Sequence, residues 1–303
     1  MPKESFEQFV ERQKKRLKEA KKMVEEVKER WKDKIEEFEI EKSVEKSVKE
    51  LKKLWEENEE EARKKKNRNE FFSFLSSLNF PEIPSFLLEK VSNKFLKEFD
   101  LKRFEKGYLD AGLFLGFFLS AFLKRSIEKN YILSQKEKDI KEEDIEPIKV
   151  HLDIRKLPIC FDYLGYRNPK RLCLVIKGNC GWGIGSEMEG GEIVIKGNCG
   201  SFTGSGMEDG KIIVKGNCED WTGCKMKGGE VIVEGGCGYW TGYKMRGGKL
   251  IVKGKVKFDE TTFCQNQGGI IIIRKTKIWE KGNWTKQGMK MRVRGEIPMR
   301  RVC

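Results

Sequence analysis

The sequence predicts an α+β chain in which a helical N-terminal region is followed by a parallel β-helix. Three observations predict this fold class. A 19-residue repeat runs through the C-terminal half, an apolar stripe of seven-residue period runs through the first 70 residues, and a thirteen-residue apolar stretch lies between them. A repeat of constant period indicates one small unit stacked on copies of itself, because a single unit cannot bury its own apolar side chains.

Three residue types mark the repeat by recurring at intervals of nineteen. Four consecutive copies keep this register, so like side chains are expected to stack as ladders along one axis. We expect the cysteine and methionine ladders to be structural. The ladders are Cys180, Cys199, Cys218 and Cys237; Met188, Met207, Met226 and Met245; and Gly178, Gly197, Gly216, Gly235 and Gly254.

Each copy contains one short strand and a glycine-rich return. About fourteen residues remain for the return, which is too few for the crossover helix that usually joins parallel strands. A coil of β-helix is the remaining solution. The coil over 255–269 is longer and lacks the cysteine and methionine, as expected of a capping coil. The predicted strands are Leu172–Lys177, Glu192–Lys196, Lys211–Lys215, Glu230–Glu234, Lys249–Lys253 and Ile270–Arg274.

The repeat resembles a known family. The pattern Gly-Asn-Cys-Gly-x-x-Thr-Gly-x-x-Met-x-x-Gly-x-Ile-x-Val-x-Gly, from Gly197 to Gly216, is similar to the GXGXG right-handed β-helix. That domain forms the C-terminal part of the glutamate synthase large subunit (alpha subunit) and most of one subunit of formylmethanofuran dehydrogenase. The resemblance covers about residues 172–274 and implies a right-handed β-helix with a non-catalytic assembly role. It carries over no catalytic residue, and nothing in the chain resembles the glutaminase, flavin or iron-sulfur parts of glutamate synthase.

We divide the chain into five segments. Residues 1–70 form a charged helical or coiled-coil arm, 71–134 a helical domain, 135–150 a linker, 151–274 the β-helix and 275–303 a basic tail or cap. In the arm, an apolar residue recurs every seventh position, and its 22 basic and 20 acidic side chains largely offset one another. We interpret the arm as a solvated helix with a narrow packing seam. The heptad residues are Val10, Leu17, Val24, Trp31 and Phe38.

The helical domain contains an apolar stretch from Ala111 to Leu123. It is shorter than the roughly twenty residues of a membrane span, so we expect a buried helix and no membrane contact. Gly112, Gly116 and Ser120 stand four apart on one face, an arrangement that lets helices pack closely.

The strands also carry an apolar residue at their middle position, so an apolar row remains on the outside of the sheet whichever parity points inward. A sheet that is apolar on both faces is normally covered on both. We expect the helix of Ala111–Leu123 or another protein to cover this row; the alternative is an exposed stripe of β-formers. The row is Val175, Val194, Ile213, Ile232 and Ile251.

The cysteine ladder does not predict a metal site. Stacked coils place thiols in a line roughly 4.8 Å apart, whereas tetrahedral zinc needs four ligands around one point. The chain has no Cys-x-x-Cys pair, and His151 is its only histidine. We expect no catalytic residue, no metal and no cofactor, and we interpret the repeated glycines as structural turns.

Basic residues concentrate towards the C-terminus. Residues 146–303 hold 28 basic and 16 acidic side chains, and the last thirty hold ten and two. Basic side chains interleaved with tryptophan are typical of nucleic-acid surfaces, although a cap over the end of the β-helix explains the tryptophans equally well. The candidate partner or nucleic-acid surface is Trp279, Trp284, Lys286, Lys290, Arg292 and Arg294.

Composition and charge bound the function. The charged fraction of 36%, dominated by Lys and Glu, is common in thermophile proteins. The cysteine spacing and the absence of an apolar leader at the N-terminus favour the cytoplasm. We expect a non-catalytic scaffold or complex subunit that binds a protein partner or a second copy of itself. The alternatives are a nucleic-acid-binding protein and an accessory subunit of an oxidoreductase completed by other chains.

Overall fold

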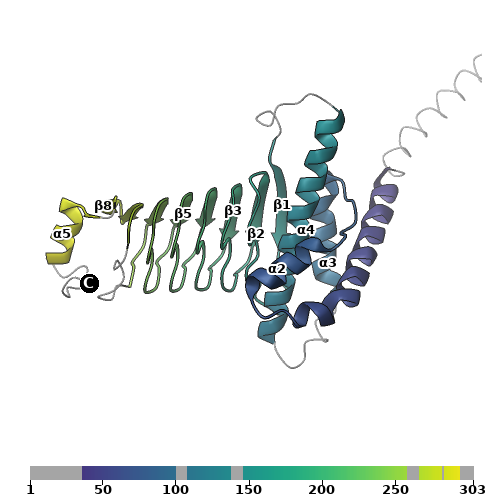
Figure 1. Ribbon diagram of the computed structural model, residues 1–303, viewed down its shortest axis with the longest axis horizontal. Coiled ribbons are helices and arrows are strands. Elements are labelled where there is room, and N and C mark those ends of the chain that lie inside the picture. The colour runs from purple at the N-terminus through teal and green to yellow at the C-terminus, as the bar shows by residue number, and fades with distance from the viewer. Residues whose placement is uncertain (1–35, 100–107, 138–145, 258–265, 282, 294–303) are drawn as a thin grey trace, which may run out of the picture. The chain divides into compact units, whose positions relative to one another are not determined.

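The computed structural model describes residues 36–99, 108–137, 146–257, 266–281 and 283–293 (Figure 1). The chain divides into two compact units, Met1–Ser47 and Val48–Cys303. In the first unit, residues 36–47 are helical. The predicted heptad residues before Phe38 lie outside the described residues. The second unit contains helices followed by a parallel β-solenoid, as the sequence predicts.

The helical part of the second unit is held together by aromatic rings. The ring of Trp55 lies 5.1 Å from that of Phe118, and the ring of Phe95 lies 5.6 Å from the same ring. All three side chains are buried. Among the described residues no helix is sufficiently long and apolar to cross a membrane. The helices cover residues 48–63, α2 Arg68–Ser77, the 3-10 helix η1 Ser85–Leu87, α3 Leu88–Glu98 and α4 Tyr108–Glu137.

Seven parallel strands form the solenoid, and they pair in chain order. Each residue pairs with the one nineteen positions further along in the regular coils, as Ile193 does with Ile212. The strands predicted from the repeat are confirmed to within one residue. They are β1 Ile148–Asp153, β2 Leu172–Lys177, β3 Glu192–Lys196, β4 Lys211–Val214, β5 Glu230–Val233, β6 Lys249–Val252 and β7 Ile270–Ile273.

Hydrogen bonds also join the connecting segments of successive coils. The amide of Gly204 donates to the carbonyl of Ile184, and that of Gly223 donates to the carbonyl of Thr203, each at 2.8 Å. Gly204 has φ +67°, and a Cβ there would contact Val231 and Ile212. Glycine is therefore required at this corner both by the backbone conformation and by the space available.

Asparagine side chains form a further ladder between coils. The side-chain oxygen of Asn179 accepts the amide of Asn198 at 2.9 Å, and that of Asn198 accepts the amide of Asn217 at 2.8 Å. Asn217 repeats the contact with the amide of Gly236. Each asparagine satisfies a backbone donor that the strands leave unpaired.

The structure contains one strand before those predicted from the repeat. β1 starts at Ile148, inside the segment expected to be a linker, and Cys160 stands twenty rather than nineteen residues before Cys180. The amide of Gly181 nevertheless donates to Phe161 and that of Gly185 to Leu164. The first coil therefore stacks on the second in spite of its different length.

Helix α4 packs on the first coil, and this corrects two expectations. A Cβ at Gly112 or Gly116 would collide with the carbonyl oxygen of Cys160 or Asp162, respectively. The hydroxyl of Ser120 accepts the amide of Gly165 at 2.9 Å. The small residues of α4 thus admit the backbone of a coil and not another helix. Four of the five residues of the apolar row, all but Val175, remain partly exposed, so α4 does not bury the row.

Helix α3 covers the free edge of β1. The amide group of Asn93 donates to the carbonyl of His151 at 2.6 Å and accepts the amide of Asp153 at 3.0 Å. The carboxylate of Glu89 accepts the amide of His151 at 3.0 Å. These side chains form hydrogen bonds with backbone groups of β1 that would otherwise be free to pair with another strand.

The other end of the solenoid closes with antiparallel strands. β8 Thr276–Glu280 pairs antiparallel with β7, and β9 Asn283–Trp284 pairs antiparallel with β8. Helix α5 Lys286–Val293 follows and packs on β8. The segment predicted as a basic tail or cap therefore begins as a cap over the last coil.

We predict that Gly116→Ala destabilises the protein by about 2 kcal/mol or more, because the new methyl group meets a backbone carbonyl that cannot rotate away. Thermal or urea unfolding followed by circular dichroism measures this loss. Ser73→Ala, at an exposed position of α2, is the control and should change stability little. Equal stabilities for Gly116→Ala and the wild type would contradict the packing of α4 on the first coil.

Candidate functional site

The predicted cysteine and methionine ladders lie inside the solenoid. The four methionines are fully buried, and the four cysteines are between 3% and 6% exposed. Hydrogen bonds with neighbouring thiols, followed by burial, raise the pKa of both Cys199 and Cys237. The same contacts, with Cys199 first and Cys237 second, lower the pKa of Cys218, which lies between these two thiols. Among the described residues, no group of three or more His, Cys, Asp or Glu side chains is arranged so that it could hold a metal ion.

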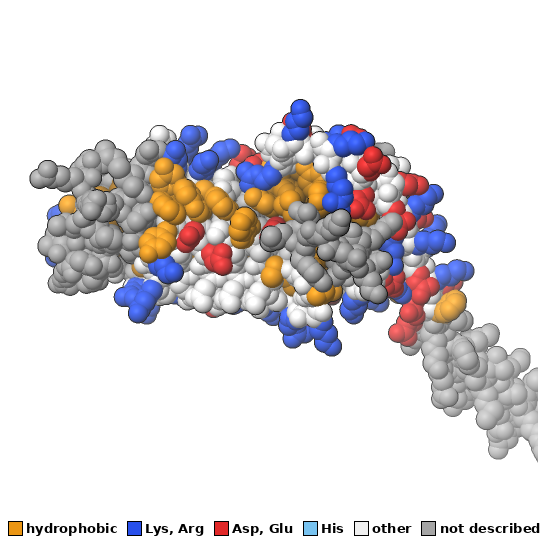
Figure 2. Space-filling model, turned by 90° about the horizontal axis from the view of Figure 1, so that it is seen from below, with side chains coloured by type: hydrophobic (Ala, Val, Ile, Leu, Met, Phe, Trp, Pro, Cys, Tyr) orange, Lys and Arg blue, Asp and Glu red, His pale blue; other side chains and the backbone are white. Residues whose placement is uncertain are grey.

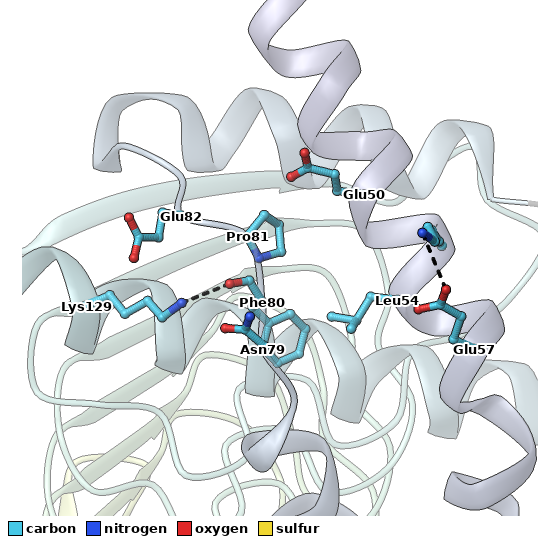
Figure 3. A pocket seen from close by; sticks show the side chains of 9 residues that line it. Glu50, Leu54, Glu57, Asn79, Phe80, Pro81, Glu82 and Lys129 are labelled. Carbon is cyan, nitrogen blue, oxygen red and sulfur yellow. Dashed lines mark hydrogen bonds and ion pairs between the residues drawn. The ribbon is translucent and has the colours of Figure 1, made fainter.

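A pocket of about 420 Å³ opens in the helical part, between the helix of residues 48–63 and α4 (Figure 3). The ammonium group of Lys129 donates to the carbonyl of Phe80 at 2.9 Å, and Lys53 pairs with Glu57 at 3.6 Å. Both lysines that line the pocket therefore already contact protein oxygens. The remaining lining combines apolar and polar side chains without a recognisable catalytic arrangement. It consists of Leu54, Phe80 and Pro81 together with Glu50, Glu57, Asn79 and Glu82.

The outward side chains of β3 to β6 form a surface that we call the sheet face. Its middle column is apolar and half-buried, and a charged column runs on either side. The middle column is Val194, Ile213, Ile232 and Ile251, and the charged columns are Glu192, Lys211, Glu230 and Lys249, and Lys196, Lys215, Glu234 and Lys253. Val175 of β2 is 5% exposed, unlike the later members of the row.

Ion pairs run along the charged columns. Glu230 lies 2.9 Å from Lys249 and 3.4 Å from Lys211. Hydrogen bonding to Lys249 is the largest of the effects that lower the pKa of Glu230. Glu234 is likewise 3.0 Å from both Lys215 and Lys253. Ion pairs between neighbouring strands therefore hold these charged side chains in position on the sheet face.

A second surface consists of aromatic side chains on the connecting segments. The rings of Phe202 and Trp221 stack at 5.7 Å, and those of Trp221 and Trp240 stack at 4.7 Å. The ring of Tyr243 meets that of Trp221 edge-on at 5.2 Å. Tyr239, beside Trp240, is 40% exposed. Most ring faces of the stacked column cover one another, so the column presents chiefly ring edges to solvent.

Sequence reasoning missed this aromatic column. Its members share the 19-residue register, but the residue type changes from Gly183 to Phe202, Trp221 and Trp240. Identical residues attract notice in a repeat, whereas a column that changes type does not. A search for residue class at each position of the repeat would have revealed it.

Lysine side chains border the aromatic column in the later coils. Lys244 lies over the ring of Tyr243 at 5.3 Å, and Lys257 lies over the ring of Tyr239 at 5.8 Å. We name Tyr239, Trp240 and Tyr243, with Trp221 and Lys225, Lys244 and Lys257, the aromatic patch. Figure 2 shows that hydrophobic side chains gather along one face of the solenoid, with Lys and Arg side chains at their margin.

The charges near the aromatic patch differ from those in the earlier coils. In the earlier coils Arg167 pairs with Glu187 at 3.0 Å, and Glu189 pairs with Lys124 at 2.6 Å. Lys225 occupies the position equivalent to Glu187 in a later coil and has no carboxylate partner within the described part of the chain. The aromatic patch therefore carries positive charge that the described residues do not neutralise.

The structure separates the residues of the predicted C-terminal surface. Trp279 is 6% exposed and packs against Trp284, with ring centroids 5.6 Å apart. Trp279 therefore belongs to the cap of the solenoid and not to an exposed surface, which agrees with the cap interpretation and corrects its inclusion in the candidate binding surface. Lys286 and Lys290 are exposed on α5. The side chain of Arg292 and the whole of Arg294 lie outside the described residues.

Comparison with known proteins found no matching family model, no matching curated protein and no matching solved structure.

We predict that Glu230→Gln lowers stability by about 0.5 kcal/mol at pH 7, because it removes the carboxylate from its two ion pairs. The pKa of Glu230 is lowered in the folded state. The stabilisation is therefore present above the pKa of the unfolded chain and is lost as the pH falls through the lowered pKa.

Unfolding of the wild type and of Glu230→Gln at a series of pH values tests this dependence. The stability difference should shrink as the pH falls below the ordinary range of a glutamate. Glu82→Gln, at an exposed position outside the solenoid, serves as the control and should show little difference at any pH. A Glu230→Gln difference that is independent of pH would rule out the ion pairs as its cause.

Proposed function

We propose that the protein is a non-catalytic assembly subunit with a right-handed β-helix of the GXGXG type, and that it binds a partner protein on the side of its solenoid. The observation that carries the proposal is the aromatic patch, which combines Trp and Tyr side chains with lysines on a rigid repeat. The repeat pattern of Gly197–Gly216 supports the family and the handedness by resemblance. The heptad pattern of residues 1–70 supports a coiled-coil arm as a further attachment.

The chemistry of the aromatic patch favours a protein partner. Tryptophan and tyrosine are enriched among the residues that contribute most to binding at protein interfaces. Trp221 stacks on Trp240, so these two rings offer edges for packing against apolar side chains more readily than faces for stacking bases. Lys225, Lys244 and Lys257 favour a partner with acidic side chains around an apolar centre.

We predict that Lys225→Glu with Lys244→Glu reduces recovery of the partner at least tenfold, because the two changes reverse the charge beside the patch. Affinity purification of the cross-linked full chain from its native cell, quantified by mass spectrometry, measures the loss. The control is Lys149→Glu with Lys156→Glu, which makes the same charge change at two exposed positions, one in β1 and one after it.

Partner recovery should survive in the control variant. Equal recovery with both double variants would refute binding at the aromatic patch. The identity of the recovered protein decides the alternative of an oxidoreductase subunit, since a molybdenum, tungsten or amidotransferase enzyme would support it. Recovery of the chain alone would count against any partner enzyme.

A nucleic-acid-binding role is the second candidate, and exposed Lys286 and Lys290 on α5 favour it. If it holds, single-stranded RNA binds the full chain with an affinity that falls steeply with salt, because phosphate contacts release counterions. Lys286→Glu with Lys290→Glu should weaken binding, whereas Lys149→Glu with Lys156→Glu should not. A fluorescence anisotropy titration that shows no salt-sensitive binding would eliminate this role.

A further inference from the structure

One charged column of the sheet face is complementary in charge to its own reverse. In the first charged column the order along the solenoid is Glu192, Lys211, Glu230, Lys249. Read from the opposite end, the order becomes positive, negative, positive, negative. A column of this kind complements an inverted copy of itself at every position. Twofold-symmetric interfaces require this property, because the same surface patch must serve both partners.

The middle column supplies apolar area between the charges. Val194, Ile213, Ile232 and Ile251 point outward from neighbouring strands and remain partly exposed. Among the described residues, the main helix packing on strands involves β1 and β8, at the two ends of the sheet. β3 to β6 thus present an apolar row flanked by ordered charges.

We propose that two copies of this chain pack sheet face against sheet face around a twofold axis parallel to the strands. This axis reverses the order of coils and keeps each column opposite itself. Glu192 of one copy then faces Lys249 of the other, and Lys211 faces Glu230. All four positions of the first charged column meet an opposite charge across the interface.

The second charged column agrees with this arrangement at its centre. Lys215 of one copy faces Glu234 of the other, while Lys196 and Lys253 oppose each other at the two margins. Like charges at a solvated margin cost less than like charges at a buried centre. The central coils therefore define the register.

The other simple face-to-face arrangement is disfavoured by the same charges. A twofold axis along the solenoid would place the first column of one copy over the second column of the other. Lys211 would then face Lys215, Glu230 would face Glu234, and Lys249 would face Lys253. Three of the four coils would meet like charges, and like-charge contacts oppose association.

The ion pairs within each sheet are compatible with contacts to a second copy. The side chains of Lys211 and Lys249 are each 42% exposed although both pair with Glu230. An ammonium group has three donors, so each can also reach a carboxylate on a facing sheet. The sheet face spans four coils of roughly 4.8 Å and is smaller than the ~800 Å² per partner of a standard interface. We therefore expect a weak dimer.

This inference extends the proposed function by naming a second copy as one partner, and it concerns a different surface. The sheet face lies on the strands, whereas the aromatic patch lies on the segments between them. A result that refutes dimerisation through the sheet face therefore does not refute partner binding at the aromatic patch, and the reverse also holds. The Lys225→Glu with Lys244→Glu variant, which alters only the aromatic patch, should dimerise like the wild type.

Sedimentation velocity of the full chain over about 1 to 300 μM tests the proposal through charge complementation. Lys211→Glu alone and Glu230→Lys alone should each weaken self-association about tenfold, because each places like charges opposite each other twice. An equimolar mixture of the two variants should recover the wild-type affinity, since every altered charge then faces its opposite. Ile232→Thr, which keeps a strand-forming residue but removes apolar area, should also weaken the dimer.

Circular dichroism establishes that each variant keeps the wild-type fold. A wild-type chain that stays monomeric throughout the concentration range would overturn the proposal. A dimer unaffected by the Lys211, Glu230 and Ile232 variants would also overturn it and would point to the helical arm. A dimer that the single variants weaken and their mixture does not restore would refute the proposed register.

Discussion

Hydrogen bonding between successive coils is the constraint on which this structure depends. A coil whose backbone groups pair with the coils above and below cannot end without leaving a row of unpaired groups. The protein meets this requirement differently at its two ends. Asn93 and Glu89 of α3 occupy the free edge of β1, whereas β8 turns back antiparallel and covers β7. The helical region therefore contributes to the stability of the solenoid by pairing with its first strand.

The repeat allowed much of this fold to be predicted, because a strict period specifies register as well as strand. β2 to β7 follow from the spacing of Cys180, Cys199 and their equivalents. The strand of the first coil, β1, was not predicted because Cys160 is one residue out of register and the segment after β1 is longer. Local spacing identifies copies of a unit, and it fails where a terminal unit changes length.

The packing of α4 shows a different limit of sequence reasoning. Gly112, Gly116 and Ser120 indicate that something approaches the helix closely, but they do not identify what approaches. The approaching element is the backbone of residues 160–165, which is nearly fifty residues away in the chain. Similarly, the tryptophans near the C-terminus suggested a binding surface, whereas burial shows that Trp279 closes the last coil. Composition cannot distinguish an exposed aromatic ring from one that caps a core.

The candidate functional surfaces lie where the repeats differ from one another. Inside the solenoid, the columns of cysteine and methionine are constant because each coil must fill the same space. Outside, the columns change charge or residue type from coil to coil, as Glu187 gives way to Lys225. Variation among copies of one unit is thus the signal for function in this chain. It separates the aromatic patch and the sheet face from residues that only maintain the coil.

Deletion of one whole repeat tests the central claim most directly. Removing residues 216–234 joins Lys215 to Gly235, and each strand then pairs with the neighbour that has the same register. Circular dichroism and urea unfolding should show a folded solenoid that is shorter by one coil and still unfolds cooperatively. Removing residues 216–225, about half a repeat, should abolish cooperative unfolding. Loss of folding in both deletions, or in neither, would contradict a structure built from stacked 19-residue coils.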